Sequence, residues 1–485
     1  MTEPKNILVW FRADLRIADN PALHRAAIDA VAGNGAVVAV FVICPEQWQS
    51  HDWSGIKVDF ILRHLQELSA DLGKLNIPML IESVPEFGAV PKLLVAVALR
   101  HHCSAIYWNK ELEFNEARRD AAVAAACKQA GLRAVGFMDQ TLVEPDDIRT
   151  GEGNVYTVFT PFKRSLYRAI EARAGIRVLP APRKQSPLPL VPSRIPESIN
   201  GFLSHVPSAA SLWPAGERRA RKRLSAFVEN SIRTYKSQRD QPALNSTSAL
   251  SPYLAVGSIS SRQCIAGALE ANGGKLDGPN PGPTTWISEL AWREFYRHIM
   301  AGFPRVCMGR AFKPDTERIA WAWDKNLFNA WCAGRTGFPI VDAGMRQLAA
   351  TGWMHNRVRM IVAMFLTKDL FFDWRRGERW FMRHLVDGDL GSNNGGWQWS
   401  ASTGTDAAPY FRIFNPFSQS RTCDTNGDYI RRWVPELAAL DGGEKGAIHD
   451  PSTLPPLARA RIDYPGPIVD HAKAKDRVMK AFQSL

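Results

Sequence analysis

The chain has 485 residues, of which 45% are hydrophobic and 22% are charged, and it carries a formal net charge of +12 at pH 7. That length is more than one hydrophobic core usually covers, so we expect two domains, and the basic surplus favours a polyanionic partner such as nucleic acid. The sequence excludes a transmembrane helix because it has no apolar run of about 18 residues, and its seven scattered cysteines exclude a disulfide or zinc framework.

Strand and helix patterns alternate through residues 1–140. Short runs rich in β-branched and aromatic residues predict strands at residues 7–11, 36–44, 79–84, 105–109 and 133–138. Helical spacing lies between them, at residues 21–31, 55–74, 90–101 and 115–130. This alternation predicts an α/β domain with a doubly wound parallel sheet. No signal peptide precedes the first strand, so we expect a cytoplasmic protein.

The first strand–helix turn, at residues 12–15, lacks the G-x-G-x-x-G sequence of dinucleotide-binding folds. An ordinary NAD-binding half is therefore not expected. Residues 178–201 contain six prolines, which predict an extended connection. We assign residues 141–218 to a linker between the two domains.

Long helical patterns dominate residues 219–485, and 11 of the 16 tryptophans lie from Trp286 onward. This half is predicted to be an all-α domain with a large aromatic core, part of which can stack on planar ligands. Thr247–Pro252 is rich in hydroxyl groups and leads into a helix at Pro252. It is either a simple helix cap or a phosphate site.

Two further helical segments place polar side chains on one face. Glu289, Trp292, Arg293 and Tyr296 are spaced i, i+3, i+4 and i+7, which fits either a surface ion pair beside a core tryptophan or a polar floor for a planar ligand. Residues 352–360 place Asn356, Arg359 and Met360 close together on a second helix. His355 has no second ligand at metal-binding spacing, so we assign no metal site.

The densest pattern is DGDLGSNNGGWQWSASTGTDAAPYFRIFNP, at residues 387–416. It lacks helical periodicity and contains several helix breakers, yet it is too aromatic for a solvated linker. We therefore expect an ordered loop that binds a ligand.

Taken together, these segments resemble the photolyase/cryptochrome family of flavoproteins. The resemblance is carried, in order, by LVWFRADLRIADNPAL, TSALSPYLAVGSIS, WISELAWREFYRH, TGFPIVDAGMRQLAATGWMHNRVRM, DLFFDWRRGERWF and the segment at residues 387–416. It spans nearly the whole chain and is strongest to bacterial, class I-like cyclobutane pyrimidine dimer photolyases. It implies an antenna-binding α/β domain and a helical domain that binds FAD and DNA.

The resemblance also implies roles for individual residues. FAD would be held by Tyr235, Thr247, Ser248, Ala249, Leu250, Ser251, Trp286, Glu289, Arg293, Asn356, Arg359, Asp387, Gly388, Asp389 and Asn393, with Asn393 opposite flavin N5. The damaged DNA would contact Arg239, Glu289, Trp292, Tyr296, Asn356, Arg357, Met360 and Trp399. Trp397, Trp374 and Trp321 would relay electrons to oxidised flavin, with Trp323 and Trp353 as extra indoles. Gly395 and Gly396 would let the backbone turn between the flavin and two indoles.

The implied activity is that of a carbon–carbon lyase that repairs DNA with light. Reduced, anionic FAD would donate an electron to a flipped pyrimidine dimer, split its cyclobutane ring and regain the electron. The implied partner is UV-damaged DNA, which a monomer without an obligate protein partner would bind at the nucleoid. The alternatives are a blue-light photoreceptor (cryptochrome), a photolyase for the (6-4) photoproduct and an ordinary flavin oxidoreductase. Met360, in a run that is not rich in histidine, favours the cyclobutane dimer.

An antenna chromophore is the third implied ligand. A reduced folate, methenyltetrahydrofolate, would contact His51, Glu113, Asn115, Glu116 and Cys307. Met308 stands where some relatives have lysine, which weakens a contact with the folate tail. A deazaflavin antenna, or none, is the alternative.

Overall fold

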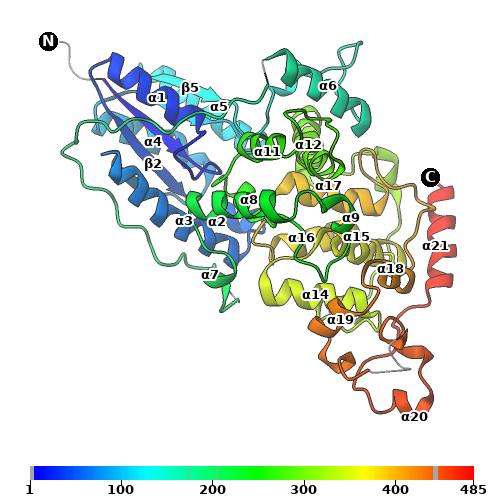
Figure 1. Ribbon diagram of the computed structural model, residues 1–485. Coiled ribbons are helices and arrows are strands. Elements are labelled where there is room, and N and C mark those ends of the chain that lie inside the picture. The colour runs from blue at the N-terminus through cyan, green and yellow to red at the C-terminus, as the bar shows by residue number, and fades with distance from the viewer. Residues whose placement is uncertain (1–4, 174, 205, 441–445) are drawn as a thin grey trace. The chain divides into compact units, whose positions relative to one another are not determined.

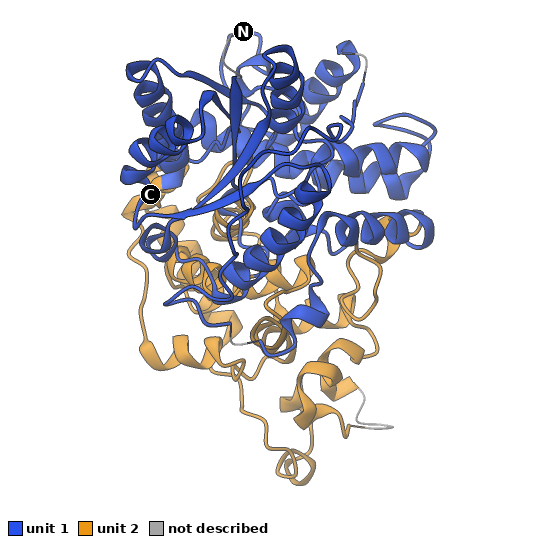
Figure 2. Ribbon diagram, turned by 90° about the vertical axis from the view of Figure 1, so that its left-hand side faces the viewer, with its two compact units in different colours: residues 1–233, 248–307, 386–391 blue, residues 234–247, 308–385, 392–485 orange. Residues whose placement is uncertain are grey.

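The computed structural model describes residues 5–173, 175–204, 206–440 and 446–485. The chain forms two compact units, each assembled from separate stretches of sequence (Figure 2). Unit 1 comprises residues 1–233, 248–307 and 386–391, and unit 2 comprises residues 234–247, 308–385 and 392–485. The boundaries inferred from sequence, residues 1–140, 141–218 and 219–485, remain a prediction.

Unit 1 contains the predicted doubly wound parallel sheet (Figure 1). Its strands are β1 (Asn6–Phe11), β2 (Val37–Ile43), β3 (Met79–Ser83), β4 (Cys103–Asn109) and β5 (Arg133–Phe137), in the order β3-β2-β1-β4-β5. All five predicted strands are confirmed, with ends that differ by two residues at most. Every residue of β2 is buried, as expected for a strand covered on both faces. The strand order reverses beside β1, and ligands of such sheets bind at the carboxyl ends of the strands at this point.

The helices of unit 1 include the four that the sequence predicts within the α/β region. The helices are α1 (Pro21–Ala32), α2 (Pro45–Ser50), α3 (Gly55–Lys74), α4 (Val90–Arg100), α5 (Phe114–Gln129), α6 (Phe159–Ala172), α7 (Ala209–Leu212), α8 (Glu217–Asn230), α10 (Ser251–Ala255), α11 (Ser261–Glu270) and α12 (Pro281–Gly302). The Asn20 side chain caps α1 and accepts from the Leu23 N–H, while Pro21 occupies the first turn. The proline-rich residues 178–201 form neither helix nor strand, as predicted.

A buried ionic network joins distant parts of unit 1. Asp139 accepts from Arg16 and Arg262, both at 2.5 Å, and Arg262 also contacts Asp19 at 2.9 Å. Burial alone would raise the pKa of Asp139, but the two guanidinium groups lower it by a larger amount. The pKa of Asp139 therefore lies below its ordinary value. The carboxylate therefore adds stability above its ordinary pKa, and this contribution is lost as the pH falls through the folded-state pKa.

We predict that Asp139→Asn lowers the free energy of unfolding by about 3–5 kcal/mol at pH 7, because Arg16 and Arg262 lose the buried carboxylate that they share. Urea unfolding followed by circular dichroism would measure the change. Asp147→Asn is the matched control: it removes an exposed pair with Arg173, whose side chains are 46% and 48% exposed, respectively, and should cost less than about 1 kcal/mol. Equal losses in the two variants would contradict the role assigned to the network.

The regular secondary structure in the described residues of unit 2 is helical, apart from one isolated bridge between Ala322 and Phe372. Its helices are α9 (Tyr235–Gln238), α13 (Lys325–Cys332), α14 (Pro339–Thr351), α15 (Asn356–Met364), α16 (Trp374–Met382), α17 (Leu390–Ala401, whose first two residues belong to unit 1), α18 (Pro416–Cys423), α19 (Asp428–Trp433), α20 (Pro456–Arg459) and α21 (His471–Gln483). The buried core contains Trp331, Trp374 and Trp397 together with many aliphatic side chains. The predicted all-α region with a tryptophan-rich core is confirmed for these residues.

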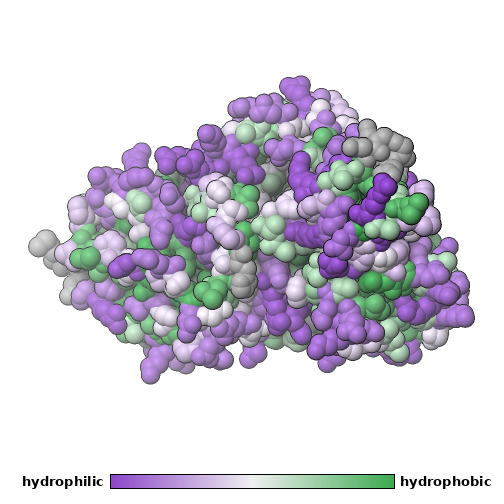
Figure 3. All heavy atoms as spheres, turned by 90° about the horizontal axis from the view of Figure 1, so that it is seen from below, coloured by the Kyte–Doolittle hydropathy of each residue, from purple (hydrophilic) through white to green (hydrophobic). Residues whose placement is uncertain are grey.

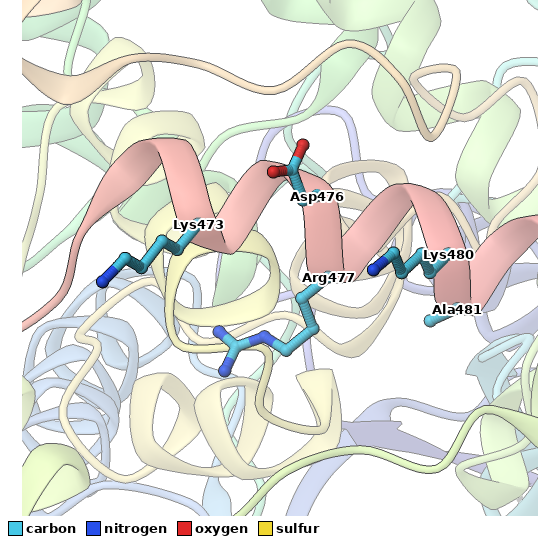
Figure 4. A pocket seen from close by; sticks show the side chains of 5 residues that line it. All are labelled: Lys473, Asp476, Arg477, Lys480 and Ala481. Carbon is cyan, nitrogen blue, oxygen red and sulfur yellow. The ribbon is translucent and has the colours of Figure 1, made fainter.

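The carboxyl-terminal helix α21 is tied to a buried π-helix, η5 (Phe365–Asp369). His471 contacts Asp369 at 2.5 Å, and Arg477 donates to the Asp369 main-chain oxygen at 2.6 Å. The same face of α21 lines a hollow of about 620 Å³ with Lys473, Arg477 and Lys480 (Figure 4). Because Arg477 is engaged with the π-helix, we assign α21 a structural role.

The expectation of a loop at residues 387–416 is wrong for its first half. Residues 390–401 form α17, and Gly395 and Gly396 lie inside this helix, so they do not make the expected turn. Burial explains why helix forms without sequence periodicity, since Trp397 on α17 is only 2% exposed. A side chain at Gly377 of α16 would collide with the Trp397 ring, so this glycine permits the two helices to approach closely.

None of the helices in the described ranges is both long enough and apolar enough to cross a membrane. Figure 3 shows one face of the molecule, on which hydrophobic residues gather in small groups and not in one continuous patch.

Candidate functional site

The residues implicated by the sequence fall into one set in each unit. Unit 1 carries Ser248, Ala249, Leu250, Ser251, Trp286, Glu289, Trp292, Arg293, Tyr296, Asp387, Gly388 and Asp389, together with all five antenna residues. Unit 2 carries Tyr235, Arg239, Thr247, Trp321, Asn356, Arg357, Arg359, Met360, Trp374, Asn393, Trp397 and Trp399. Each set is described within its own unit.

Helix α12 presents the predicted face of unit 1. Trp286 is 4% exposed, whereas Glu289 and Arg293 are partly exposed. Arg293 donates to Ser261 Oγ at 3.0 Å and to the main-chain oxygens of Gln140 at 3.2 Å and Leu254 at 3.3 Å. Burial lowers the pKa of Arg293 to about 10, so the group stays cationic at pH 7. Its position is fixed by three acceptors, which makes it a rigid cation for an anionic ligand.

Trp292 has a partner that the sequence did not reveal. Its indole stacks face to face on Phe159 of α6, with ring centroids 3.7 Å apart and planes inclined by 9°. Phe159 in turn contacts Phe295 edge-on at 5.9 Å. This contact joins residues 133 positions apart, and no local pattern indicates it. The stack holds the Trp292 ring plane in one orientation.

The turn at residues 387–389 is held by two buried cations from other helices of unit 1. Arg297 of α12 pairs with Asp389 at 2.5 Å, and Lys57 of α3 donates to the Gly388 main-chain oxygen at 2.7 Å. Asp387 is 6% exposed. The sequence identified the turn but neither cation, because their contacts span 92 and 331 residues.

The hydroxyl-rich segment before α10 has a backbone suited to a close turn. Ala249 adopts a positive φ of 46°, and Ser248 Oγ accepts from the Leu250 N–H at 3.4 Å. The predicted helix start is confirmed, although α10 covers only residues 251–255.

Four of the residues assigned to the antenna follow strands of unit 1 beside the reversal of strand order: His51 comes after β2, and Glu113, Asn115 and Glu116 come after β4. Cys307 comes from a different part of unit 1, the short turn Pro304–Met308 after α12. His51 Nε2 lies 3.0 Å from the side-chain amides of both Asn115 and Gln47, and His51 Nδ1 lies 3.4 Å from Glu116. Gln140 donates to Glu113 at 3.4 Å. Ligands of doubly wound sheets bind at this place in the fold, which agrees with the set assigned from sequence.

Burial keeps most of this set uncharged at neutral pH. It lowers the pKa of His51 to about 4 and raises the pKa of Glu116 to about 8, with Glu113 and Glu111 raising it further. Burial also raises the pKa of Glu113, and it raises that of the Cys307 thiol to about 12. Glu113 and Glu116 lie close enough to Cys307 to affect its pKa, which places the thiol with the set. Neutral His51 accepts at Nε2 and therefore carries its proton on Nδ1, toward Glu116.

Asn393 of unit 2 is fixed by a neighbouring helix. Its Nδ2 donates to the Glu378 main-chain oxygen at 2.9 Å, and the Glu378 carboxylate accepts from Asn394 at 2.8 Å. Gln398 donates to Asn394 Oδ1 at 2.8 Å. These bonds set the orientation of the Asn393 amide, which is 9% exposed.

The three tryptophans assigned from the sequence to an electron relay belong to unit 2, with Trp374 fully buried, Trp397 2% exposed and Trp321 partly exposed. A second aromatic series starts from the same Trp397 and ends at Trp323, one of the extra indoles named from the sequence, through Trp331 and Phe328, which the sequence did not indicate. Trp331 lies 6.2 Å from Trp397 and 5.7 Å from Phe328, which lies 5.2 Å from Trp323. Trp323 is 47% exposed and has Arg376 3.6 Å above its ring.

The remaining predicted residues of unit 2 surround α9 and α15. Asp240 accepts from Arg357 at 2.8 Å and lies 3.8 Å from Arg239, whose guanidinium is 5.5 Å from the Tyr235 ring. Met360 and Trp399 are partly buried against the unit 2 core, and Asn356 is exposed. His355 caps α15 by accepting from the Arg357 N–H at 3.2 Å, which gives it a structural role.

The family model described as the FAD binding domain of DNA photolyase matches residues 286–484, and that described as DNA photolyase matches residues 7–183. The deoxyribodipyrimidine photo-lyase of Salmonella typhimurium is 43% identical over 98% of this chain and 98% of its own length.

Two solved structures of photolyase and cryptochrome proteins are similar to this chain over nearly its full length. That of a bacterial class III photolyase from Agrobacterium tumefaciens has a TM-score of 0.88 and 34% identity, and the match covers 100% of this chain and 98% of that one. That of a Synechocystis cryptochrome has a TM-score of 0.84 and 28% identity, with 99% and 100% covered.

Proposed function

The chain belongs to the DNA photolyase family, and on that premise we propose that it is a light-driven DNA repair enzyme that splits pyrimidine dimers with bound FAD. The observation that carries this proposal is similarity over nearly the full length to deoxyribodipyrimidine photo-lyases, 43% identical in the case of Salmonella typhimurium.

The chemistry of the residues in unit 1 fits a flavin dinucleotide. Arg293 offers a fixed cation and Ser248 and Ser251 offer hydroxyl groups for the phosphates, while the carboxylates of Asp387 and Asp389 accept from ring N–H and ribityl hydroxyl groups. In unit 2, Tyr235, Thr247, Asn356, Arg359 and Asn393 are assigned to the same cofactor. When bound and reduced, FAD supplies a photoexcitable electron donor for ring cleavage.

Asn393 has the clearest individual role. Since its Nδ2 donates to the main chain of Glu378, its Oδ1 is the atom assigned to accept the N5–H of reduced flavin. A neutral amide there orients the ring without adding charge.

Glu289, Trp292, Met360, Trp399 and Asn356 are assigned to the flipped lesion. Glu289 is assigned to hydrogen-bond the bases and to stabilise the negative charge that they gain. Trp292, held in orientation by Phe159, offers an indole face to the bases. Arg239, Arg357 and Tyr296 are assigned to the DNA strand, where cations contact phosphates.

Trp397, Trp374 and Trp321 relay electrons that reduce oxidised flavin under light. Indole rings suit this task because they are large and oxidisable, and the buried Trp397 and Trp374 are shielded from solvent. The aromatic series through Trp331 to the exposed Trp323 offers a second route from Trp397.

We assign the antenna residues His51, Glu113, Asn115, Glu116 and Cys307 to methenyltetrahydrofolate. The imidazole, amide and carboxyl groups of this set offer hydrogen-bond donors and acceptors to the polar edge of a pterin ring. The absorption spectrum of the purified protein tests this assignment: a folate adds a strong near-UV band, a deazaflavin adds a violet band, and flavin bands alone would mean that no antenna is bound.

Lesion choice separates this proposal from its alternatives. Fully reduced protein is expected to repair a cyclobutane dimer under blue light and to leave a (6-4) photoproduct intact. The reason is that this chain has Met360, in the run HNRVRM, near the place where (6-4) relatives have a histidine-rich sequence. Oligonucleotides that each contain one lesion would be analysed by chromatography after light and after dark incubation. Repair of the (6-4) lesion alone would reverse the assignment, and repair of neither would favour a photoreceptor. We propose that it acts on DNA at the nucleoid in the cytoplasm, as a monomer, and its net charge of +12 favours the contact with DNA.

A further inference from the structure

Lys57 is a buried lysine that the proposed repair mechanism does not use. It lies in the first turn of α3, where Ser54 Oγ accepts from its N–H at 3.1 Å, and the residue is only 6% exposed. Its Nζ donates to the Gly388 main-chain oxygen at 2.7 Å and lies 3.7 Å above the Trp53 ring. Lysine is almost never buried to this extent unless its charge is paired.

The surroundings of the ammonium group supply that pairing from several elements. Burial lowers the pKa of Lys57 to about 8, and Asp389 opposes this shift most strongly. Glu111 opposes it too, whereas Glu116, whose own pKa is raised to about 8, is mostly uncharged at pH 7. Arg297 is a second buried cation of this region, and its charge interacts with the carboxyl groups of Asp389 and Glu113. Lys57 therefore sits between the antenna residues and the turn at residues 387–389.

Arg297 and Lys57 contact different parts of the turn at residues 387–389. Arg297 holds the Asp389 side chain and Lys57 holds the main chain at Gly388. Without Lys57, the Gly388 carbonyl, in a residue that is itself buried, would lose its hydrogen-bond donor. A shift of the backbone there would move the carboxylates of Asp387 and Asp389 together.

We propose that Lys57 is a positioning residue for FAD, which fixes the turn bearing Asp387 and Asp389 by holding the Gly388 carbonyl from α3. This inference rests on the proposed function, in which both carboxylates contact the cofactor. It adds a residue that lies outside the motifs through which the chain resembles its family.

The experiment compares FAD dissociation constants of antenna-free protein at 10 °C, using apoprotein reconstituted with FAD. Lys57→Met keeps the length of the side chain but removes charge and donor, and it is expected to weaken FAD binding about tenfold, the effect of losing one charge-assisted hydrogen bond. Lys57→Arg keeps the charge and the hydrogen-bond donor, so its FAD dissociation constant should be closer to that of the parent. Lys368→Met is the matched control, since Lys368 is another fully buried lysine, bonded to Ser402 Oγ at 2.8 Å in unit 2. It should lower the melting temperature without changing FAD affinity.

The pH dependence supplies a readout that does not require Lys57→Met to fold. As the pH rises from 7 to 9, the parent loses the ammonium charge through its pKa of about 8, so FAD affinity should fall. Lys57→Arg stays charged and should lack this component. The pKa of Glu116, also about 8, and the charges of Asp389, Glu111, Glu113, Arg119, Arg297 and His51 are common to both proteins and cancel in the comparison.

Parent affinity in Lys57→Met, or identical pH profiles in the parent and Lys57→Arg, would overturn the inference. If these results came from a parent protein that binds FAD and repairs dimers, only the role of Lys57 would fail. A parent protein that cannot bind FAD would instead overturn the proposed function.

Discussion

Glu289→Ala is expected to lower the repair yield of reduced enzyme about tenfold while FAD remains bound, the loss expected for one hydrogen bond to a charged group worth about 1.4 kcal/mol. The partly exposed carboxyl group lies on α12 one turn before Arg293, whose three acceptors hold it in place without Glu289. Removing Glu289 therefore leaves that anchor intact. The measurement is the number of dimers split per absorbed photon, with bound flavin quantified by absorption.

Glu289→Gln provides the matched control, because its amide keeps the length of the side chain and can still hydrogen-bond the bases. We expect its yield to lie between those of the parent and the alanine variant. Equal yields in parent and Glu289→Ala would refute the assigned role, whereas loss of flavin from Glu289→Ala would show that the residue binds the cofactor instead.

Trp374→Phe is expected to slow photoreduction of oxidised flavin at least about tenfold, equivalent to a barrier raised by about 1.4 kcal/mol or more. A phenyl ring is much harder to oxidise than indole, so the relay from Trp397 would be interrupted. Repair by enzyme that has been chemically reduced beforehand should persist, because the relay serves only to restore the reduced cofactor. Flavin absorption under continuous blue light with an added thiol follows the first process.

The second aromatic series gives this prediction its control. Any residual photoreduction in Trp374→Phe should disappear when Trp331→Phe is added, since Trp331 lies 6.2 Å from Trp397. Trp353→Phe is the control outside both series and should have no effect; the Trp353 ring packs edge-on against His355, at 6.3 Å. Unchanged photoreduction in Trp374→Phe alone would show that the route through Trp331 suffices.

The predicted sheet followed from the sequence because buried parallel strands form continuous apolar runs, as β2 does. Helix α12 followed from its spacing, which placed Glu289 and Arg293 one turn apart. Helix α17 did not, because its glycines and polar residues lack a helical pattern. The structure gains its stability there from tertiary burial of Trp397, which no local pattern expresses.

The missed residues share one property, which is that their partners lie far away in the sequence. Lys57 contacts Gly388, Phe159 contacts Trp292, and Arg297 contacts Asp389. Family motifs identified the second member of each pair, since the motifs contain the residues assigned to ligands. The supporting residues are identified only by folding, which brings α3 and α6 against the elements that carry the motifs.

Light-dependent cleavage of a defined lesion tests the central claim most directly. Protein loaded with fully reduced FAD would be mixed with an oligonucleotide that contains one cyclobutane thymine dimer, and the products would be separated by chromatography after blue light or darkness. The account predicts conversion of the dimer to two intact thymines in the light and none in the dark. Dimers that remain intact under blue light, with FAD shown to be bound and reduced, would contradict it.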